Sequence, residues 1–160
     1  HREGRVRWKA TAIPQGYSVP MTRTEVRLSK VVVVDDQPQQ FLQFAEVTAD
    51  ATPRALSLII GATEALEISR AVRKEETPRP MTHELVHQLI DVLGGSIQEL
   101  EIHHLHQGTY HATLRLGHAD GTVRVDCRPS DGVALALRAG AKIFVTENVW
   151  DQIQADPNQE

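Results

Sequence analysis

The run Asp-Cys-Arg-Pro-Ser-Asp at residues 126–131 constrains the fold of this chain more than any other stretch. Residues 122–125 before it alternate and contain β-branched side chains, which is typical of a strand. The residues after it are rich in Ala and Leu, so the run lies at a strand-to-helix junction. Backbone N–H groups at a helix start lack intrahelical partners, and an arginine beside them suits a phosphate or carboxylate ligand.

A purely structural interpretation of the same run is also open. Ser130 or Asp131 can cap the helix, Pro129 fits its first turn, and Arg128 can pair with Asp126. None of these roles requires a ligand. The run alone therefore supports both a binding site and an ordinary helix start.

Periodicity along the chain predicts the fold class α+β. Apolar residues at helical spacing, with capping and stop signals, predict helices at residues 62–73, 82–93 and 130–139. Apolar or alternating runs predict strands at residues 30–34, 41–47, 55–60, 96–106, 109–116, 121–127 and 142–145. Because neighbouring strands are often hairpin-linked, we expect a mixed, largely antiparallel sheet with about three helices packed on it.

Charge divides the chain into a basic arm and an acidic body. Residues 1–30 carry seven Lys or Arg against two Glu, whereas residues 31–160 carry ten against nineteen acidic residues. We expect a flexible basic arm at residues 1–27, one domain at residues 28–152 and a short polar tail at residues 153–160. The acidic body predicts only weak, local binding of a nucleic acid, because such binding usually depends on a basic surface.

Cysteine content and hydropathy suggest a location for the protein. Cys127 is the only cysteine, and neither a signal peptide nor a long apolar span is visible. We therefore expect a cytoplasmic protein without membrane contact. The apolar run at residues 31–34 can pair with the same run of a second copy, which predicts a homo-oligomer, most simply a dimer.

Three motifs, in order along the chain, resemble the bifunctional nuclease family. The run at residues 126–131, with the Gly-Val-Ala-Leu-Ala that follows, resembles the family's signature. Ile-Gly-Ala-Thr-Glu-Ala-Leu-Glu-Ile at residues 60–68 and Arg-Pro-Met-Thr-His-Glu-Leu at residues 79–85 resemble two further motifs. The likeness extends over roughly residues 28–150. Glu84 replaces the usual Asp, and Gly132 replaces the usual Ala.

This resemblance implies hydrolysis of phosphodiester bonds in RNA and DNA with little sequence specificity. Such chemistry needs a phosphate cradle, charge neutralisation and a proton-transfer group. The candidates are Arg79, Arg128 and Ser130 for substrate binding, His83, Glu84, Asp126 and Asp131 for catalysis, and Glu64 and Thr82 as supporting residues. Asp126 and Asp131 are also candidate ligands of Mg²⁺ or Mn²⁺, and no organic cofactor is expected. An equally simple interpretation pairs the arginines with the carboxylates in a structural network.

A remote alternative is a zinc-dependent hydrolase. His83-Glu84-Leu85-Val86-His87 fits the His-Glu-x-x-His pattern, in which two histidines on one helix face share a zinc ion. However, the motif lies in the first turn of its predicted helix, and no third ligand stands at an expected position. Accidental spacing within the nuclease-like motif explains the pattern better.

A second group of histidines lies in the predicted hairpin of residues 96–116. Alternation places His104 and His106 on one strand face, with His111 across the turn. Three imidazoles there can bind a transition metal or titrate near neutral pH. Polar strand residues that face solvent are the simpler interpretation.

A non-catalytic oligomeric module, with an interaction or regulatory role, is the second function class. Its support is the acidic body without a basic groove. The two classes differ in what they require of Arg79, Arg128, Asp131 and His83. A nuclease needs these side chains to line one open concavity, whereas closed and buried salt bridges favour the module.

Overall fold

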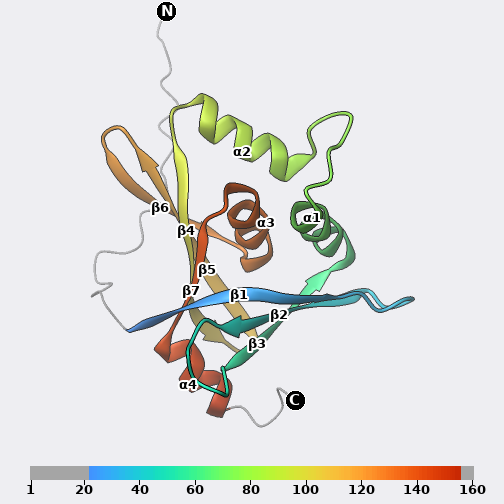
Figure 1. The fold of residues 1–160 in the computed structure, drawn as a ribbon, viewed down its shortest axis with the longest axis vertical. Coiled ribbons are helices and arrows are strands. Elements are labelled where there is room, and N and C mark those ends of the chain that lie inside the picture. Colours follow the sequence, from blue (N-terminus) through green and yellow to red (C-terminus); the bar gives the residue numbers. More distant parts are fainter. Residues whose placement is uncertain (1–21, 156–160) are drawn as a thin grey trace, which may run out of the picture.

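A computed structural model describes residues 22–155 as one curled sheet with helices packed against it (Figure 1). The elements in chain order are β1 (Arg23–Val32), β2 (Gln39–Glu46), β3 (Ala55–Gly61), α1 (Ala62–Arg73), α2 (Thr82–Val92), β4 (Ser96–His106), β5 (Thr109–His118), β6 (Gly121–Cys127), α3 (Pro129–Ala139), β7 (Lys142–Thr146) and α4 (Glu147–Ala155). The predicted α+β class is confirmed.

The seven strands form one mixed sheet in the order β3-β2-β1-β7-β4-β5-β6. β4 and β7 pair in parallel, and the other neighbouring strands pair antiparallel. β3 and β6 are therefore the two edge strands. Both edges line the same cleft, so the sheet curls until they face each other.

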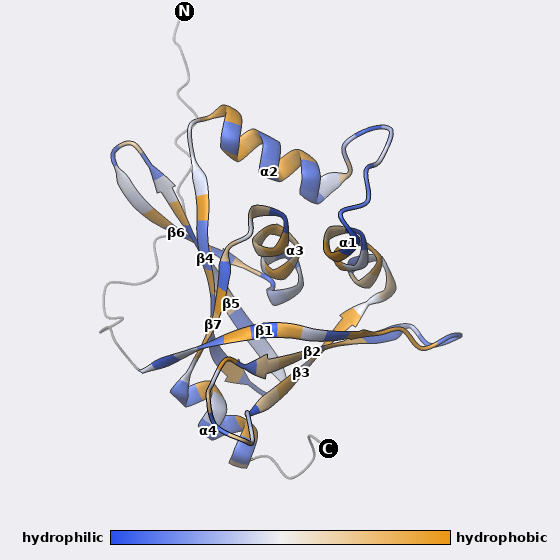
Figure 2. Ribbon diagram, in the orientation of Figure 1, coloured by the Kyte–Doolittle hydropathy of each residue, from blue (hydrophilic) through white to orange (hydrophobic). Residues whose placement is uncertain are grey.

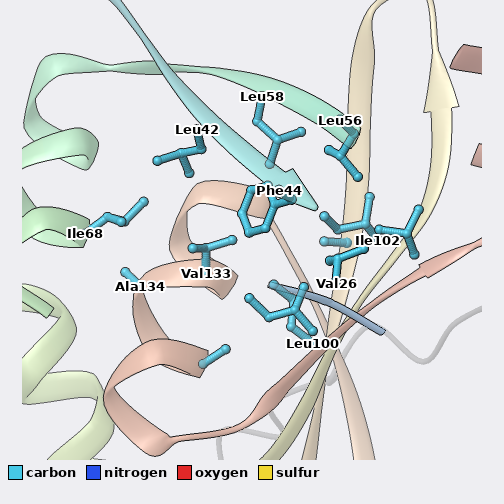
Figure 3. Packing of buried hydrophobic residues seen from close by; sticks show 14 of the residues in the cluster. Val26, Leu42, Phe44, Leu56, Leu58, Ile68, Leu100, Ile102, Val133 and Ala134 are labelled. Carbon is cyan, nitrogen blue, oxygen red and sulfur yellow. The ribbon is translucent and has the colours of Figure 1, made fainter. Parts of the chain in front are cut away.

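The apolar core fills the space between the sheet and α3. β3 alternates exposed and buried residues, which turns Leu56 and Leu58 inward. Figure 3 shows Val133 of α3 among inward-facing side chains such as Phe44 and Leu100. Because α3 is buried along most of its length, its start is held firmly against the sheet.

Three helices cluster and the fourth lies apart (Figure 1). α1 and α2 pack on α3, whereas α4 packs on β4 and β7. α2 has no fully buried side chain, although Val86 and Ile90 contact the core. Hydrophobic and hydrophilic residues alternate along α2 in Figure 2, and the exposed side chains of Leu85 and Leu89 are among the hydrophobic ones.

The structure corrects several predicted bounds. The first strand is Arg23–Val32 rather than residues 30–34, so residues 23–27 lie in β1. β1 pairs with β2 along residues 26–32 but with β7 only along residues 23–26, so residues 31–32 are bonded on one side and the dimer stays a prediction. Four helices are described instead of about three, because Glu147–Ala155 follows β7 without a turn signal. Residues 1–21 and 156–160, most of the predicted arm and tail, lie outside the described residues.

Candidate functional site

α1, α2 and α3 all begin with a carboxylate at the third helical residue. These residues are Glu64, Glu84 and Asp131. A negative side chain is favourable there, because the first N–H groups of a helix are unpaired and carry partial positive charge. The three motifs found in the sequence are thus three helix starts, and the fold brings them together.

Gly61 makes room for the carboxylate of Glu64. A Cβ atom at residue 61 would overlap Glu64 Oε2. With glycine there, Glu64 folds back over the start of α1, and its Oε1 lies 3.3 Å from Arg128 Nη1. The Ile-Gly-x-x-Glu motif therefore has a packing reason, since it allows α1 to meet the first residues of α3.

Arg128 and Asp131 form a two-point ion pair at the start of α3. Arg128 donates from Nε to Asp131 Oδ2 at 2.7 Å and from Nη2 to Oδ1 at 3.1 Å. The side chain of Arg128 is still 66% exposed. The hydrogen bonds that Arg128 donates to Asp131 raise the pKa of Arg128 further above its usual range. Arg128 is therefore a fixed, permanently charged donor that faces solvent.

Asp131 links this exposed arginine to a largely buried histidine. His83 Nε2 lies 2.9 Å from Asp131 Oδ1, and the side chain of His83 is 13% exposed. Burial opposes the charged form of Asp131, but hydrogen bonds from Arg128 and His83 outweigh it and lower the pKa of this carboxyl. The motif residues of α2 and α3 are thus joined by one short contact.

Glu67 and Arg138 lie behind His83 and were not singled out from the sequence. Glu67 is 6% exposed, and its Oε1 accepts a hydrogen bond from Arg70 Nη1 at 2.7 Å. Its Oε2 lies 3.8 Å from His83 Nδ1 and 3.7 Å from Arg138 Nη2. Both residues lie inside helices: Glu67 stands at an unspecified position of the motif at residues 60–68, and Arg138 lies outside the motifs. The available signal was spacing, because Glu67 follows Glu64 by three residues and shares its helix face.

Glu84 is fully engaged in holding the start of α2. Its Oε2 accepts from Thr77 Oγ1 at 2.7 Å and from the Met81 N–H at 3.0 Å, and its Oε1 accepts from Arg138 Nη1 at 3.1 Å. The Thr77 hydroxyl, the Met81 N–H and Arg138 together lower the pKa of Glu84 against the effect of burial. Met81, rather than the predicted Thr82, occupies the N-cap position.

A cleft of about 1140 Å³ opens between the two sheet edges, next to Arg128. Its walls are β3, the turn between β4 and β5, the end of β6 and the start of α3. Glu64, Asp126 and Ser130 line it together with Arg128, which is the one Lys or Arg among the described lining residues. Cys127 also lines the cleft, but burial raises the pKa of its thiol to about 12, so it is a poor nucleophile there.

The predicted residues occupy three different positions relative to this cleft. Arg128 lines it, whereas Asp131 and His83 stand behind Arg128. Asp126 reaches it from β6, where its ladder partner is Thr113. Arg79 is exposed in the loop between α1 and α2 and makes no ion pair within residues 22–155.

The carboxylates do not form a ready cation site. Both oxygens of Asp131 already accept N–H donors. No three His, Cys, Asp or Glu side chains among the described residues are arranged to hold a metal ion. The present donor set therefore does not fit the predicted Mg²⁺ or Mn²⁺, and we derive no step through a metal.

The side chains of the His-Glu-x-x-His pattern also do not converge on one point. His83 directs its Nε2 to Asp131, whereas His87 Nε2 lies 3.8 Å from Asp91 Oδ2 on its own helix. Glu84 is occupied by the helix cap. The side chains therefore point to three different partners rather than to one zinc ion.

The histidines of the β4–β5 hairpin do lie close together, as predicted. The His104 ring centroid is 6.0 Å from that of His106 and 5.7 Å from that of His111. Burial lowers the pKa of His103 at the same hairpin. The three rings do not meet the geometry of a metal site within residues 22–155.

The fold and these contacts define an α+β domain whose helix starts supply charged side chains beside a cleft. The Bifunctional nuclease domain pattern matches residues 46–158, so the chain belongs to the bifunctional nuclease domain family. A protein of Mycobacterium tuberculosis strain H37Rv, named an uncharacterized protein, is 41% identical over 128 residues, covering 80% of this chain and 74% of that protein. Bifunctional nuclease 1 of Oryza sativa subsp. japonica is 23% identical over 103 residues, covering 62% of this chain and 31% of that protein.

Among residues 22–155, no helix is long and apolar enough to cross a membrane.

Proposed function

We propose that this chain is a nuclease that hydrolyses phosphodiester bonds in RNA and DNA with little sequence specificity. Membership of the bifunctional nuclease domain family supports the reaction class. The observation that carries the proposal is the connected set Arg128, Asp131 and His83 beside the cleft. It combines an exposed cation, a helix start and a proton-transfer group within hydrogen-bond reach of one another.

Arg128 and the first N–H groups of α3 bind the scissile phosphate in this proposal. A planar guanidinium offers paired donors that match phosphate oxygens, and a helix start favours an anion. Arg128 keeps two-thirds of its side chain in solvent, so a phosphate reaches it without unfolding the network. Charge on the phosphoryl oxygens is then neutralised as it develops.

Asp131 and His83 orient the site and move the proton. Asp131 holds Arg128 by two hydrogen bonds and accepts a third contact from the imidazole. Imidazole is the side chain best suited to proton transfer near neutral pH. Glu64 and Ser130 act as supporting residues at the cleft wall, and Asp126 supplies a second carboxylate from β6.

Binding is weak and local in this proposal, because the cleft carries little positive charge. Among its described lining residues, Arg128 is accompanied by Glu64 and Asp126. A few phosphate contacts give a shallow dependence of affinity on salt. A steep salt dependence would instead indicate phosphate contacts with a broad basic surface beyond this cleft.

Hydrolysis of end-labelled single-stranded RNA and DNA tests the assignment. We expect Arg128→Ala and Asp131→Ala to lower kcat/KM by about 100-fold each. Arg73→Ala is the matched control, because Arg73 is similarly exposed (69%), pairs with Glu75 and lies at the other end of α1. Equal activity in wild type and both site variants would overturn the assignment.

The metal requirement is tested in the same assay by adding EDTA and then Mg²⁺ or Mn²⁺. The predicted cation role of Asp126 and Asp131 requires loss of hydrolysis with EDTA and recovery with the metal. Unchanged hydrolysis in EDTA would remove the metal role and leave the roles of Arg128 and His83 in place.

A non-catalytic oligomeric module is the second candidate, and one observation favours it. Leu85, Leu89 and Val92 of α2, and Leu93 directly after it, leave about half or more of their surface exposed. Contiguous exposed apolar side chains commonly mark an interaction surface. Light scattering of Leu89→Glu tests this, with Gln88→Glu as the control for an added charge on the same helix. Dissociation in Leu89→Glu alone supports the module, and a monomeric wild type removes it.

A further inference from the structure

A group of buried polar atoms lies behind the pair of Arg128 and Asp131. Glu67 Oε2, His83 Nδ1 and Arg138 Nη2 are buried and have no hydrogen-bond partner among the described residues. They belong to α1, α2 and α3, respectively. Native proteins rarely leave buried polar atoms unpaired, so their convergence requires an explanation.

The distances identify Glu67 Oε2 as the shared acceptor. It lies 3.8 Å from His83 Nδ1 and 3.7 Å from Arg138 Nη2. These separations are longer than a direct N–H···O bond by about 1 Å. A small rotation of the imidazole pairs His83 Nδ1 with Glu67 Oε2, and one water between the three atoms satisfies every member of the group.

We propose that Glu67 is the positioning residue of the site: its Oε2 accepts the Nδ1 proton of His83, directly or through one water, and keeps Nε2 facing Asp131. This inference rests on the proposed nuclease function for its catalytic meaning. The geometry of Glu67 and His83 itself does not depend on that function. Glu67 stands at an unspecified position of the motif at residues 60–68, so its role follows from burial and distance.

The physical reason is that one ring nitrogen controls the other. The hydrogen bond made at Nδ1 decides where the imidazole proton resides and how the ring is oriented. A buried carboxylate behind a catalytic histidine fixes the ring and keeps a proton on the nitrogen that faces it, and its loss lowers turnover without moving the ring out of the site. Arg70 and Arg138 contact Glu67 in its buried position.

The charges around His83, which lies on α2, come from α1 and α3. Asp131 on α3 faces Nε2, and Glu67 on α1 faces Nδ1. Arg138 approaches Glu67 from α3. An imidazole between two carboxylates donates from both nitrogens, whereas an imidazole with Asp131 alone needs only its Nε2 proton.

Nitrogen NMR of ¹⁵N-histidine-labelled protein tests the contact without any activity measurement. At one fixed near-neutral pH, we expect His83 Nδ1 to show the shift of a protonated nitrogen in wild type. In Glu67→Gln it should show the shift of an unprotonated nitrogen. The His83 signals are assigned by their absence in His83→Gln. Glu64→Gln is the matched control, because Glu64 lies in the same helix and pairs with Arg128 instead.

The wild-type spectrum alone can overturn the proposal. An unprotonated Nδ1 in wild type shows that Glu67 does not hold the ring, even if Glu67→Gln fails to fold. An unchanged protonated Nδ1 in folded Glu67→Gln has the same meaning.

Kinetics then separate this inference from the proposed function. We expect Glu67→Gln to lower kcat about 10-fold at unchanged KM, and Glu67→Asp to recover part of the loss. Normal kcat in Glu67→Gln overturns the positioning role while hydrolysis stands. Absence of hydrolysis in wild type, with the NMR signature intact, overturns the nuclease function while the contact stands.

Discussion

Two arginine clusters in this protein differ in how completely their polar atoms are paired. Around Arg54, Nε donates to Glu46 at 3.0 Å, Nη1 to Glu147 at 2.8 Å and Nη2 to Glu46, Glu147 and Thr24 at 2.7, 3.0 and 3.0 Å, respectively. The guanidinium also lies 4.6 Å from the ring centre of Trp150. At the helix starts, by contrast, Arg128 is mostly exposed and three buried atoms behind it are unpaired.

The difference separates a structural role from a functional one. Every side-chain nitrogen of Arg54 has a protein acceptor, so this cluster ties β1, β2 and α4 together and has no capacity for a ligand. The Arg128 cluster also ties helices together, yet it keeps an open donor at a cleft and an incompletely paired histidine. Unused hydrogen-bonding capacity, rather than charge itself, distinguishes the candidate site.

The largest expected effect is on catalysis at the helix-start cluster. We expect His83→Gln to lower kcat by about 100-fold, because the substituted amide cannot transfer a proton near neutral pH. His87→Gln, one turn along the same helix, is the control and should hydrolyse at the wild-type rate. Initial rates with excess labelled oligonucleotide measure both. Equal losses in the two variants would mean that α2 is generally disturbed and would remove the special role of His83.

The next effect is on stability at the Arg54 cluster. Arg54→Met leaves Glu46 and Glu147 without their guanidinium donor, and we expect a loss of about 2 kcal/mol in unfolding free energy, less than for a fully buried pair. Urea unfolding measures it. The folded variant should keep its kcat, since Arg54 does not line the cleft. Arg27→Met is the control, because Arg27 is 75% exposed and pairs only loosely with Glu25. A fall in kcat would contradict the division between the clusters.

The pH dependence of stability gives a smaller and more specific comparison. Hydrogen bonds from Arg54 hold the pKa values of Glu46 and Glu147 below their ordinary value of 4.5. The stabilisation that these two carboxylates give the folded state is fully present above about pH 4.5. It is lost as the pH falls through their lowered native pKa values. Arg128→Met affects one such carboxyl, Asp131, where burial already opposes ionisation. As the pH is lowered from 6, the free energy of unfolding should therefore fall less steeply in Arg54→Met than in Arg128→Met. Equal slopes would contradict this ranking.

The smallest effect concerns Gly132, the residue that departs from the family pattern. A Cβ atom there would overlap Leu100 Cδ1 and lie 3.0 Å from Cys127 Sγ. Alanine is a better helix former by about 1 kcal/mol, but overpacking costs about 1–3 kcal/mol. We expect Gly132→Ala to destabilise the protein by about 1 kcal/mol, measured by urea unfolding. Leu100→Val should lower the unfolding free energy less in the Gly132→Ala background than in the wild type. Losses that simply add in the double variant would argue against the clash.

Local sequence patterns predicted the helix starts well, but they did not predict contacts between residues far apart in the sequence. The motifs at residues 60–68, 79–85 and 126–131 all open helices, because glycine, proline and acidic residues at helix starts have short-range causes. The start of β1 at Arg23 was missed, since its pairing with β7 joins segments far apart in sequence. Glu67 and Arg138 were missed because their meaning comes from the packing of three helices, and the spacing of Glu67 from Glu64 was the one local signal.

The weak burial of α2 gives His83 a particular kind of attachment. No side chain of α2 is fully buried, and the helix is held to α1 and α3 partly by His83, Glu84 and their charged partners. Elements with little buried apolar surface open locally at a lower free energy than the core does. The imidazole can therefore leave its partners while the sheet stays folded, which couples the state of the site to the local opening of one helix.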